Sequence, residues 1–220
     1  MTISKMFGTA VGFNFIDIEN WNRREHYLHY MNNVPCGYSF TVELVIEKIK
    51  NERLYPAMLW LLTAAVNEFI EFRSALAKDG RLGYFDSMNP TYTIFNPEQK
   101  TFSSIWTEFN SDYSKFLVAY QKDTDLYKTS TGMTPKPDCP DNVFNVSMIP
   151  WLKFSSFNLN IWKGDNYLLP IFTLGKKYTE KGVLKLPLAV QVHHAVCDGY
   201  HAGCFIEALQ EKINNWLVTN

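Results

Sequence analysis

Residues 183–199 read VLKLPLAVQVHHAVCDG, an alternating stretch that runs directly into two histidines, an aspartate and a glycine. Because the side chains of a strand alternate between its two faces, the apolar residues at even positions from Leu184 to Val192 share one face. Extending the alternation puts His194 on this apolar face and His193 on the opposite, mixed face. We therefore predict a half-buried strand over 183–194 that carries its last two side chains to opposite sides.

The sequence around this strand alternates between helical and strand-like patterns. We expect helices over Trp21–Tyr30 with an Asn20 cap, over Pro56–Phe72, from a Ser111 cap to Tyr127, and over the apolar positions Ala202, Phe205, Ile206, Leu209, Ile213 and Leu217. We expect strands over Tyr38–Ile46, Val143–Ile149, Phe157–Trp162 and Leu168–Lys176, and a hairpin over Leu82–Phe95 around Asn89-Pro90. This order predicts an α/β fold, a two-layer sandwich with one large mixed β-sheet and flanking helices.

No long linker or repeat divides the sequence, so we predict a single domain over residues 1–220. The proline-rich stretch Thr129–Asp141 is expected to be a long surface loop inside it. Hydrophobic residues make up 46% and charged residues 20%, which excludes a disordered chain. A net charge of −1 gives no support to general electrostatic binding of nucleic acid.

The longest apolar run, Ala57–Val66, has about ten residues, whereas a helix that spans a membrane needs about 20. The four cysteines form no CxxC pair and are too scattered for a disulfide framework. We therefore expect a soluble, cytoplasmic protein that binds neither membrane nor nucleic acid.

The turn after the strand gathers the side chains that can do chemistry. His194 ends an inward-facing apolar row, where desolvation keeps an imidazole neutral and suited to act as a base near pH 7, with Asp198 as an organiser. A core histidine bonded to a carbonyl is the plain alternative. A metal site would draw on His194, Asp198, His201 and a thiol, although no HExxH motif supports it. A nucleophilic thiol would be Cys197 or Cys204.

The stretch HHAVCDGYH at 193–201 resembles the signature of the chloramphenicol acetyltransferases, within the wider superfamily of CoA-dependent acyltransferases. Further segments are similar to that family in the same order: Asn20–His26, Pro35–Tyr38, Phe85-Asp86, Tyr92–Phe95, Thr101–Ser103, Asn145–Trp151 and Ser156–Asn160. The resemblance extends over nearly the whole chain after about Phe13. It implies an acyltransferase that moves an acetyl group from acetyl-CoA to the primary (3-) hydroxyl of chloramphenicol and so confers resistance to this antibiotic.

The resemblance also implies roles at the reacting centre. His194 matches the general base, which takes the hydroxyl proton directly with no acyl-enzyme step. Ser147 matches the donor to the tetrahedral oxyanion, which Thr173 supports through a water molecule. Asp198 matches an acid paired with an arginine, here Arg23, behind the base.

By position, the family's substrate pocket is lined here by Tyr30, Val34, Cys36, Tyr38, Thr93, Phe102, Ser104, Leu159, Ile171 and Thr173. Lys176 matches a residue that contacts the CoA phosphates. The resemblance implies no metal and no resident cofactor, since acetyl-CoA is a co-substrate. Members of the family are homotrimers with active sites between subunits, so we expect the same assembly here.

Two other functions stay open at this level. One is a CoA-dependent acyltransferase for a different hydroxyl or thiol acceptor. The other is a non-catalytic protein that binds a hydrophobic ligand, and the intact set of base, oxyanion donor and organising ion pair speaks against it.

Overall fold

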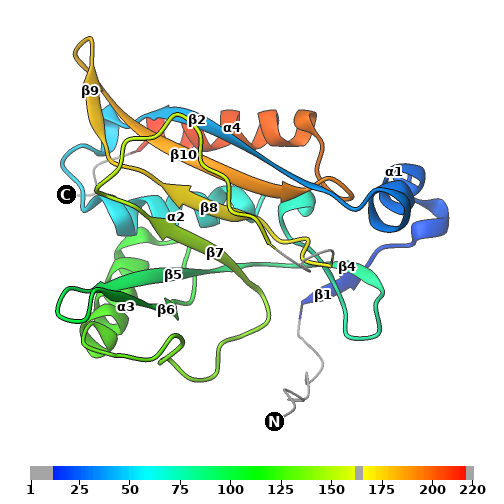
Figure 1. Ribbon diagram of the computed structural model, residues 1–220, viewed down its shortest axis with the longest axis horizontal. Coiled ribbons are helices and arrows are strands. Elements are labelled where there is room, and N and C mark those ends of the chain that lie inside the picture. Colours follow the sequence, from blue (N-terminus) through cyan, green and yellow to red (C-terminus); the bar gives the residue numbers. More distant parts are fainter. Residues whose placement is uncertain (1–11, 162–165, 217–220) are drawn as a thin grey trace.

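The computed structural model describes residues 12–161 and 166–216. Within these residues, seven strands form one mixed sheet in the order β2–β10–β8–β7–β5–β6, with β9 paired to the start of β10 (Figure 1). The strands are β2 (Gly37–Val45), β5 (Asn89–Asn96), β6 (Thr101–Trp106), β7 (Val143–Met148), β8 (Ile171–Leu174), β9 (Tyr178–Glu180) and β10 (Val183–His193). Strands β5, β7 and β8 run parallel and the other pairs are antiparallel, which confirms the large mixed sheet.

Long helices cover one face of this sheet and make the second layer (Figure 1). They are α2 (Leu54–Val66), α3 (Tyr113–Tyr127) and α4 (Gly199–Asn214). Phe172 of β8 stacks on Phe205 of α4 with ring centroids 5.4 Å apart. The ring centroids of Tyr92 in β5 and Tyr120 in α3 are 5.2 Å apart. The even-numbered apolar residues of β10 from Leu186 to Val192 are buried in this layer, as their alternation predicts. Burial of each such side chain stabilises the fold by about 1.5–3 kcal/mol.

Shorter elements surround this core. Helix α1 (Arg24–Leu28) lies beyond the ends of β2 and β10 (Figure 1). A separate antiparallel sheet holds β1 (Phe13–Phe15), β4 (Leu82–Phe85) and β3 (Ser74–Leu76), in that order. Single helical turns occur at Ile18–Asn20, His29–Asn33, Glu47–Ile49 and Ile70–Phe72. None of the helices in residues 12–161 and 166–216 is both long enough and apolar enough to cross a bilayer.

The opposite face of the large sheet carries polar side chains from β2, β10, β8 and β7. Ser39 of β2 pairs with Gln191 of β10, and Ser147 of β7 pairs with Thr173 of β8. The chain between β7 and β8 crosses in front of this face (Figure 1), where the Phe157 backbone N–H donates to Thr41 Oγ1 at 3.3 Å. We call this side of the sheet the open face.

The hairpin predicted over Leu82–Phe95 is wrong. Strand β4 pairs with β1 and β3, whereas β5 pairs with β6 and β7 in the large sheet. In the connection between the two strands, the Met88 N–H donates a hydrogen bond to the Asn67 side chain at 2.7 Å, and the Met88 carbonyl accepts one from it at 3.3 Å. Pro90 lies near the start of β5, where a missing N–H costs little.

The strand predicted over Phe157–Trp162 is also wrong. Residues 157–161 have no regular structure, and Trp162 lies outside the described residues. The alternation of apolar residues here has another cause, since Leu159 and Ile161 both line cavities on the open face.

Several element ends differ from the prediction. Asn20 donates to Asp17 rather than capping a helix, and α3 is capped by Asp112, which accepts from the Ser114 N–H at 2.9 Å. The helix predicted over Pro56–Phe72 ends at Val66, and β8 is shorter than Leu168–Lys176. Helix α4 buries Ala202, Phe205, Leu209 and Ile213 as predicted, while Leu217 lies outside the described residues.

Candidate active site

The His194 ring is held between two tyrosines at the start of the turn after β10. Strand β10 ends at His193, one residue earlier than predicted. The His194 ring stacks on Tyr30 with centroids 4.0 Å apart and planes 7° apart, and meets Tyr38 edge-on at 5.2 Å. Its backbone N–H donates to the Cys36 carbonyl at 3.0 Å. The side chain is 31% exposed, so it is fixed in orientation yet open on one side.

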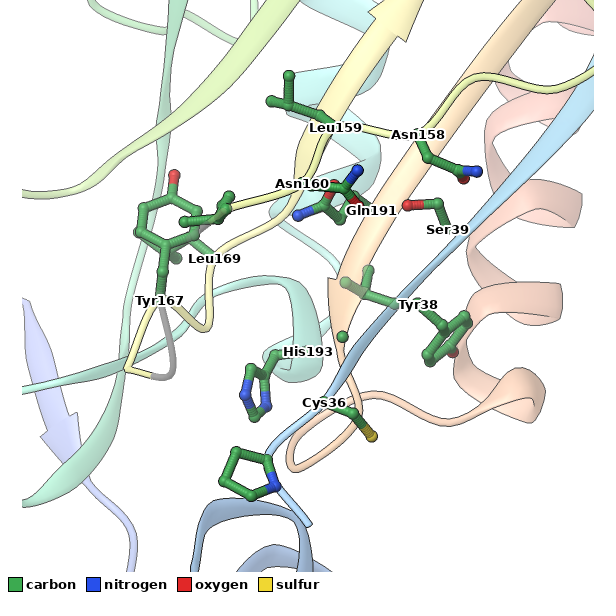
Figure 2. Close-up of a pocket in the computed structure, with 14 residues that line it drawn as sticks. Cys36, Tyr38, Ser39, Asn158, Leu159, Asn160, Tyr167, Leu169, Gln191 and His193 are labelled. Carbon is green, nitrogen blue, oxygen red and sulfur yellow. The ribbon is translucent and has the colours of Figure 1, made fainter. Parts of the chain in front are cut away.

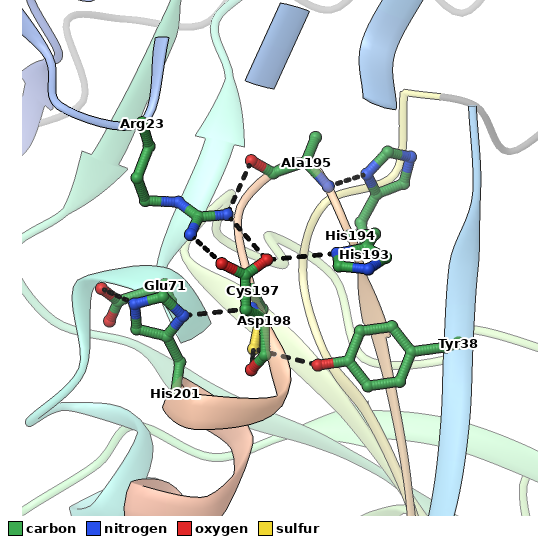
Figure 3. A network of polar contacts seen from close by, with 9 residues as sticks. All are labelled: Arg23, Tyr38, Glu71, His193, His194, Ala195, Cys197, Asp198 and His201. Carbon is green, nitrogen blue, oxygen red and sulfur yellow. Dashed lines mark hydrogen bonds and ion pairs between the residues drawn. The ribbon is translucent and has the colours of Figure 1, made fainter. Parts of the chain in front are cut away.

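An ion pair lies directly behind this ring. Arg23 binds the Asp198 carboxylate through both terminal nitrogens, with Nη2 3.1 Å from Oδ1 (Figure 3). Hydrogen bonds from Arg23 lower the pKa of Asp198 below its usual value. Asp198 Oδ1 also lies 3.2 Å from His194 Nδ1, without the geometry of a hydrogen bond. One carboxylate therefore contacts both the arginine and the imidazole.

Ser147 and Thr173 form a second group on the open face. Because β7 and β8 are parallel and in register, the two side chains lie side by side, and their hydroxyl oxygens are 3.0 Å apart. Thr173 is buried and Ser147 is half-buried. A hydroxyl pair of this kind can hold one O–H pointed at a substrate oxygen.

A first cavity of about 680 Å³ lies between β2, β10 and the chain before β8 (Figure 2). The predicted pocket residues Cys36, Tyr38 and Leu159 line it. His193 and Gln191 line it as well, on the mixed face predicted for His193.

A second cavity of about 690 Å³ lies over β5, β6 and β7. It brings together Ser147 with the predicted pocket residues Thr93, Phe102, Ser104, Leu159 and Ile171. Sequence reasoning missed other residues of its lining: Thr91, Met133, Asn145, Val146, Ile161, Asn166 and Tyr167. The sequence could have indicated Met133 as a pocket residue, because it is the one large apolar side chain in the Thr129–Asp141 loop.

His194 and Ser147 are far apart in one chain. Ser147 of β7 pairs with Thr173 of β8, and Thr173 pairs with Ala189 of β10, so Ser147 lies two strands away from Ala189. His194 follows Ala189 by five residues along the chain. At ~3.3 Å per residue and ~4.8 Å between strands, the Cα atoms of His194 and Ser147 are roughly 19 Å apart. His194 lines neither of the two large cavities, whereas Ser147 lines the second.

Comparison with known proteins identifies the family. Residues 11–210 match the sequence model of the chloramphenicol acetyltransferases. The chain belongs to this family. It is 52% identical to a chloramphenicol acetyltransferase of Campylobacter coli over 204 residues, which cover 92% of this chain and 99% of the relative.

The fold is that of a chloramphenicol acetyltransferase as well. One solved structure named as such superposes with a TM-score of 0.79 at 23% identity, covering 91% of this chain and 99% of the other. The truncated catalytic core of a 2-oxoacid dehydrogenase complex from Thermoplasma acidophilum has a TM-score of 0.64 at 12% identity, covering 98% and 99%. These two likenesses confirm the predicted fold class.

Four of the pocket and CoA residues carried over from the chloramphenicol acetyltransferase family line neither large cavity. Tyr30 stacks on His194 and Thr173 is paired with Ser147, whereas Val34 and Lys176 have no such contact with the site within the described residues. Val34 is 50% exposed. Lys176 is exposed and follows β8, at the end of that strand farthest from His193. Their assigned contacts remain predictions.

The alternative readings of the turn find little support. Burial raises the pKa of the Cys197 thiol to about 12, so thiolate is scarce at neutral pH, and its sulfur lies 3.9 Å from the Tyr38 hydroxyl. A nucleophilic Cys197 would need the opposite shift. Within residues 12–161 and 166–216, no group of three His, Cys, Asp or Glu side chains is arranged to hold a metal ion.

Asp198→Asn should lower both the rate of acetyl transfer and the stability at neutral pH. The folded-state pKa of Asp198 is depressed, so the unfolded chain binds its proton more readily. The stabilisation is therefore present above the ordinary value of 3.8 and is lost as the pH falls through the lower, folded pKa. Urea unfolding at a series of pH values should show a wild-type advantage over the variant that shrinks below about pH 4. A constant difference from pH 7 to 3, or unchanged melting and rate, would contradict the role of the ion pair.

Lys136→Met should weaken acceptor binding, because Lys136 anchors the loop that carries Met133. Lys136 Nζ lies 2.7 Å from the Asp123 carboxylate and donates to the Trp106 carbonyl at 2.8 Å, and both charged side chains are 15% exposed. We expect the KM for the acceptor to rise about fivefold, the effect of about 1 kcal/mol, with the KM for acetyl-CoA unchanged. The control is Lys128→Met, which removes an exposed lysine at the C-terminal end of α3, directly before the loop. Equal changes in both KM values would show general destabilisation instead.

Proposed function

We propose that this protein is a chloramphenicol O-acetyltransferase, which transfers the acetyl group of acetyl-CoA to the 3-hydroxyl of chloramphenicol and confers resistance. The observation that carries the choice of substrate is the 52% identity to a named chloramphenicol acetyltransferase over almost its full length. The chemistry follows from an oriented imidazole and a paired hydroxyl in the same chain.

In the proposed reaction, His194 acts as the general base. Nδ1 of its ring faces Asp198, so Nε2 is the nitrogen left for the substrate. It takes the proton of the 3-hydroxyl as that oxygen attacks the thioester carbonyl. Ser147 donates to the oxyanion that develops, and Thr173 supports it. When the tetrahedral intermediate collapses, the C–S bond breaks and the CoA thiolate takes the proton back from the imidazolium.

We further propose that two copies of the chain build each active site. A tetrahedral centre is held by groups about 3 Å away, yet His194 and Ser147 lie roughly 19 Å apart in one chain on standard strand spacings. A neighbouring copy can bring its His194 to this chain's Ser147 and second cavity. Large exposed apolar side chains around that cavity suit burial against another subunit, namely Phe95, Phe102, Met133, Trp151, Leu159 and Ile161. The homotrimer implied by the family resemblance supplies this arrangement.

Mixed oligomers test the shared site. Subunits with His194→Ala and subunits with Ser147→Ala should each be nearly inactive alone. After they are unfolded and refolded together, some oligomers will pair an intact His194 with an intact Ser147 across an interface and regain activity. Persistent inactivity of the mixture would place both groups in one chain's site and overturn the proposal.

The remaining assignments are part of the same proposal. The chain forms a single domain over 1–220 and works in the cytoplasm, where acetyl-CoA is available. Lys176 is exposed and can reach a phosphate of CoA. No metal and no resident cofactor takes part.

A thiol-release assay with acetyl-CoA tests the function. CoA should appear with chloramphenicol and should not appear with its 3-deoxy analogue, which lacks the attacking oxygen. Release with other hydroxyl or thiol acceptors only would assign a different acyltransferase. Ligand binding without any release would assign a non-catalytic protein.

A further inference from the structure

The imidazole of His201 is turned toward the backbone at the start of α4. Its Nδ1 accepts a hydrogen bond from the Asp198 N–H at 3.1 Å (Figure 3). Its Nε2 lies 3.6 Å from Oε1 of Glu71, which belongs to the helical turn at 70–72. His201 lines neither large cavity, so its contacts are with the protein's own framework.

These contacts favour one tautomer of the neutral ring. A nitrogen that accepts a hydrogen bond carries no hydrogen, so the hydrogen of the neutral ring is on Nε2. Nε2 is the nitrogen that faces the Glu71 carboxylate, which favours a hydrogen there. Glu71 thus orients the ring, and the ring holds the backbone amide of Asp198.

The Asp198 amide is one of the N–H groups at a helix N-terminus that have no partner within the helix. In a capping box, a Glu or Gln at the third helical position reaches back to accept from this amide. His201 occupies that third position in α4. It therefore accepts the hydrogen bond that a Glu or Gln side chain usually accepts, and its ring has less conformational freedom than those side chains.

We propose that His201, oriented by Glu71, is a positioning residue for the acetyl transfer, an inference that rests on the proposed function. His201 holds the backbone of Asp198, and the Asp198 carboxylate contacts both Arg23 and the His194 ring. Any shift of this backbone moves the carboxylate and with it the general base. A displacement of 1 Å at a reacting group can cost about 100-fold in rate.

The test compares His201→Met with His201→Gln. The two side chains have similar length and flexibility, but only glutamine offers an oxygen to the Asp198 amide. We expect His201→Met to lower kcat by about tenfold, less than the ~100-fold cost of a full 1 Å displacement, with both KM values within twofold of wild type. His201→Gln should recover most of kcat. Equal kcat values for the two variants, or a loss that falls on KM alone, would overturn the positioning role.

A second measurement needs no substrate, and its first part uses the wild-type protein alone. Nitrogen-15 NMR of wild-type protein labelled at histidine should show the His201 hydrogen on Nε2, and Glu71→Leu should move part of it to Nδ1. A hydrogen on Nδ1 in wild type would refute the contact, even if His201→Met does not fold.

The two readouts separate this inference from the proposed function. Should wild type release no CoA with chloramphenicol, the proposed function fails, and the catalytic part of the inference fails with it. The NMR result still decides whether His201 holds Asp198. If wild type is active and the two His201 variants are alike, only the inference fails.

Discussion

His194→Ala should lower kcat for chloramphenicol acetylation by about 10²–10⁴-fold, the usual contribution of a general base. Without the imidazole, the other titratable side chains of the turn are poor bases, because Asp198 is already bound by Arg23 and the Cys197 thiol keeps its hydrogen. Folding should survive, since the ion pair behind the ring does not need His194. Steady-state kinetics give the rate, and equilibrium dialysis with chloramphenicol checks that the variant still binds the acceptor.

The matched control is His26→Ala, which removes an exposed imidazole from α1. This variant should keep wild-type kcat. Near-normal turnover by His194→Ala would reject His194 as the base, and equal losses in the two variants would point to a general effect of removing a histidine.

Ser147→Ala should lower kcat by about 10²-fold, the cost of one lost donor to an oxyanion. The serine hydroxyl is held by Thr173 at 3.0 Å, so it is oriented before the substrate arrives. A donor that acts mainly on the developing oxyanion changes kcat and leaves KM nearly unchanged. Initial rates over a range of both substrate concentrations separate these two constants.

Ser111→Ala is the control for Ser147→Ala, because Ser111 is exposed and lies just before α3. This variant should keep wild-type kcat and KM. A pure rise in KM for Ser147→Ala would assign the hydroxyl to substrate binding. Thr173→Val, which keeps the shape and removes the supporting hydroxyl, should cause a smaller loss of kcat than Ser147→Ala.

Much of the sheet could be predicted because strand alternation is a local property. The apolar row of β10 predicted which face is buried and that His193 and His194 diverge, and β2 follows the same rule with Phe40 opposite Val190. The prediction failed at Phe157–Trp162, although this stretch alternates equally well. A strand also needs a neighbour for its backbone, and this stretch has none along residues 157–161.

Residue contacts between distant segments could not be derived from periodicity. Arg23 and Asp198 are 175 residues apart, and only the resemblance to a family suggested their pairing. The placement of Met133 in the second cavity depends on an irregular loop held by Lys136, whose partners come from α3 and β6. No local pattern encodes such a contact, because loop conformation follows from the surfaces on which it packs.

The sequence alone determined the strand that ends in two histidines, the buried face of the sheet and the family signature, since each depends on neighbouring residues or on order along the chain. The tertiary structure alone decided that His194 lies between Tyr30 and Tyr38, that His201 holds Asp198, and that Ser147 is two strands away. Those relations arise from strand order and helix packing, which bring together groups whose separation in sequence carries no information about distance.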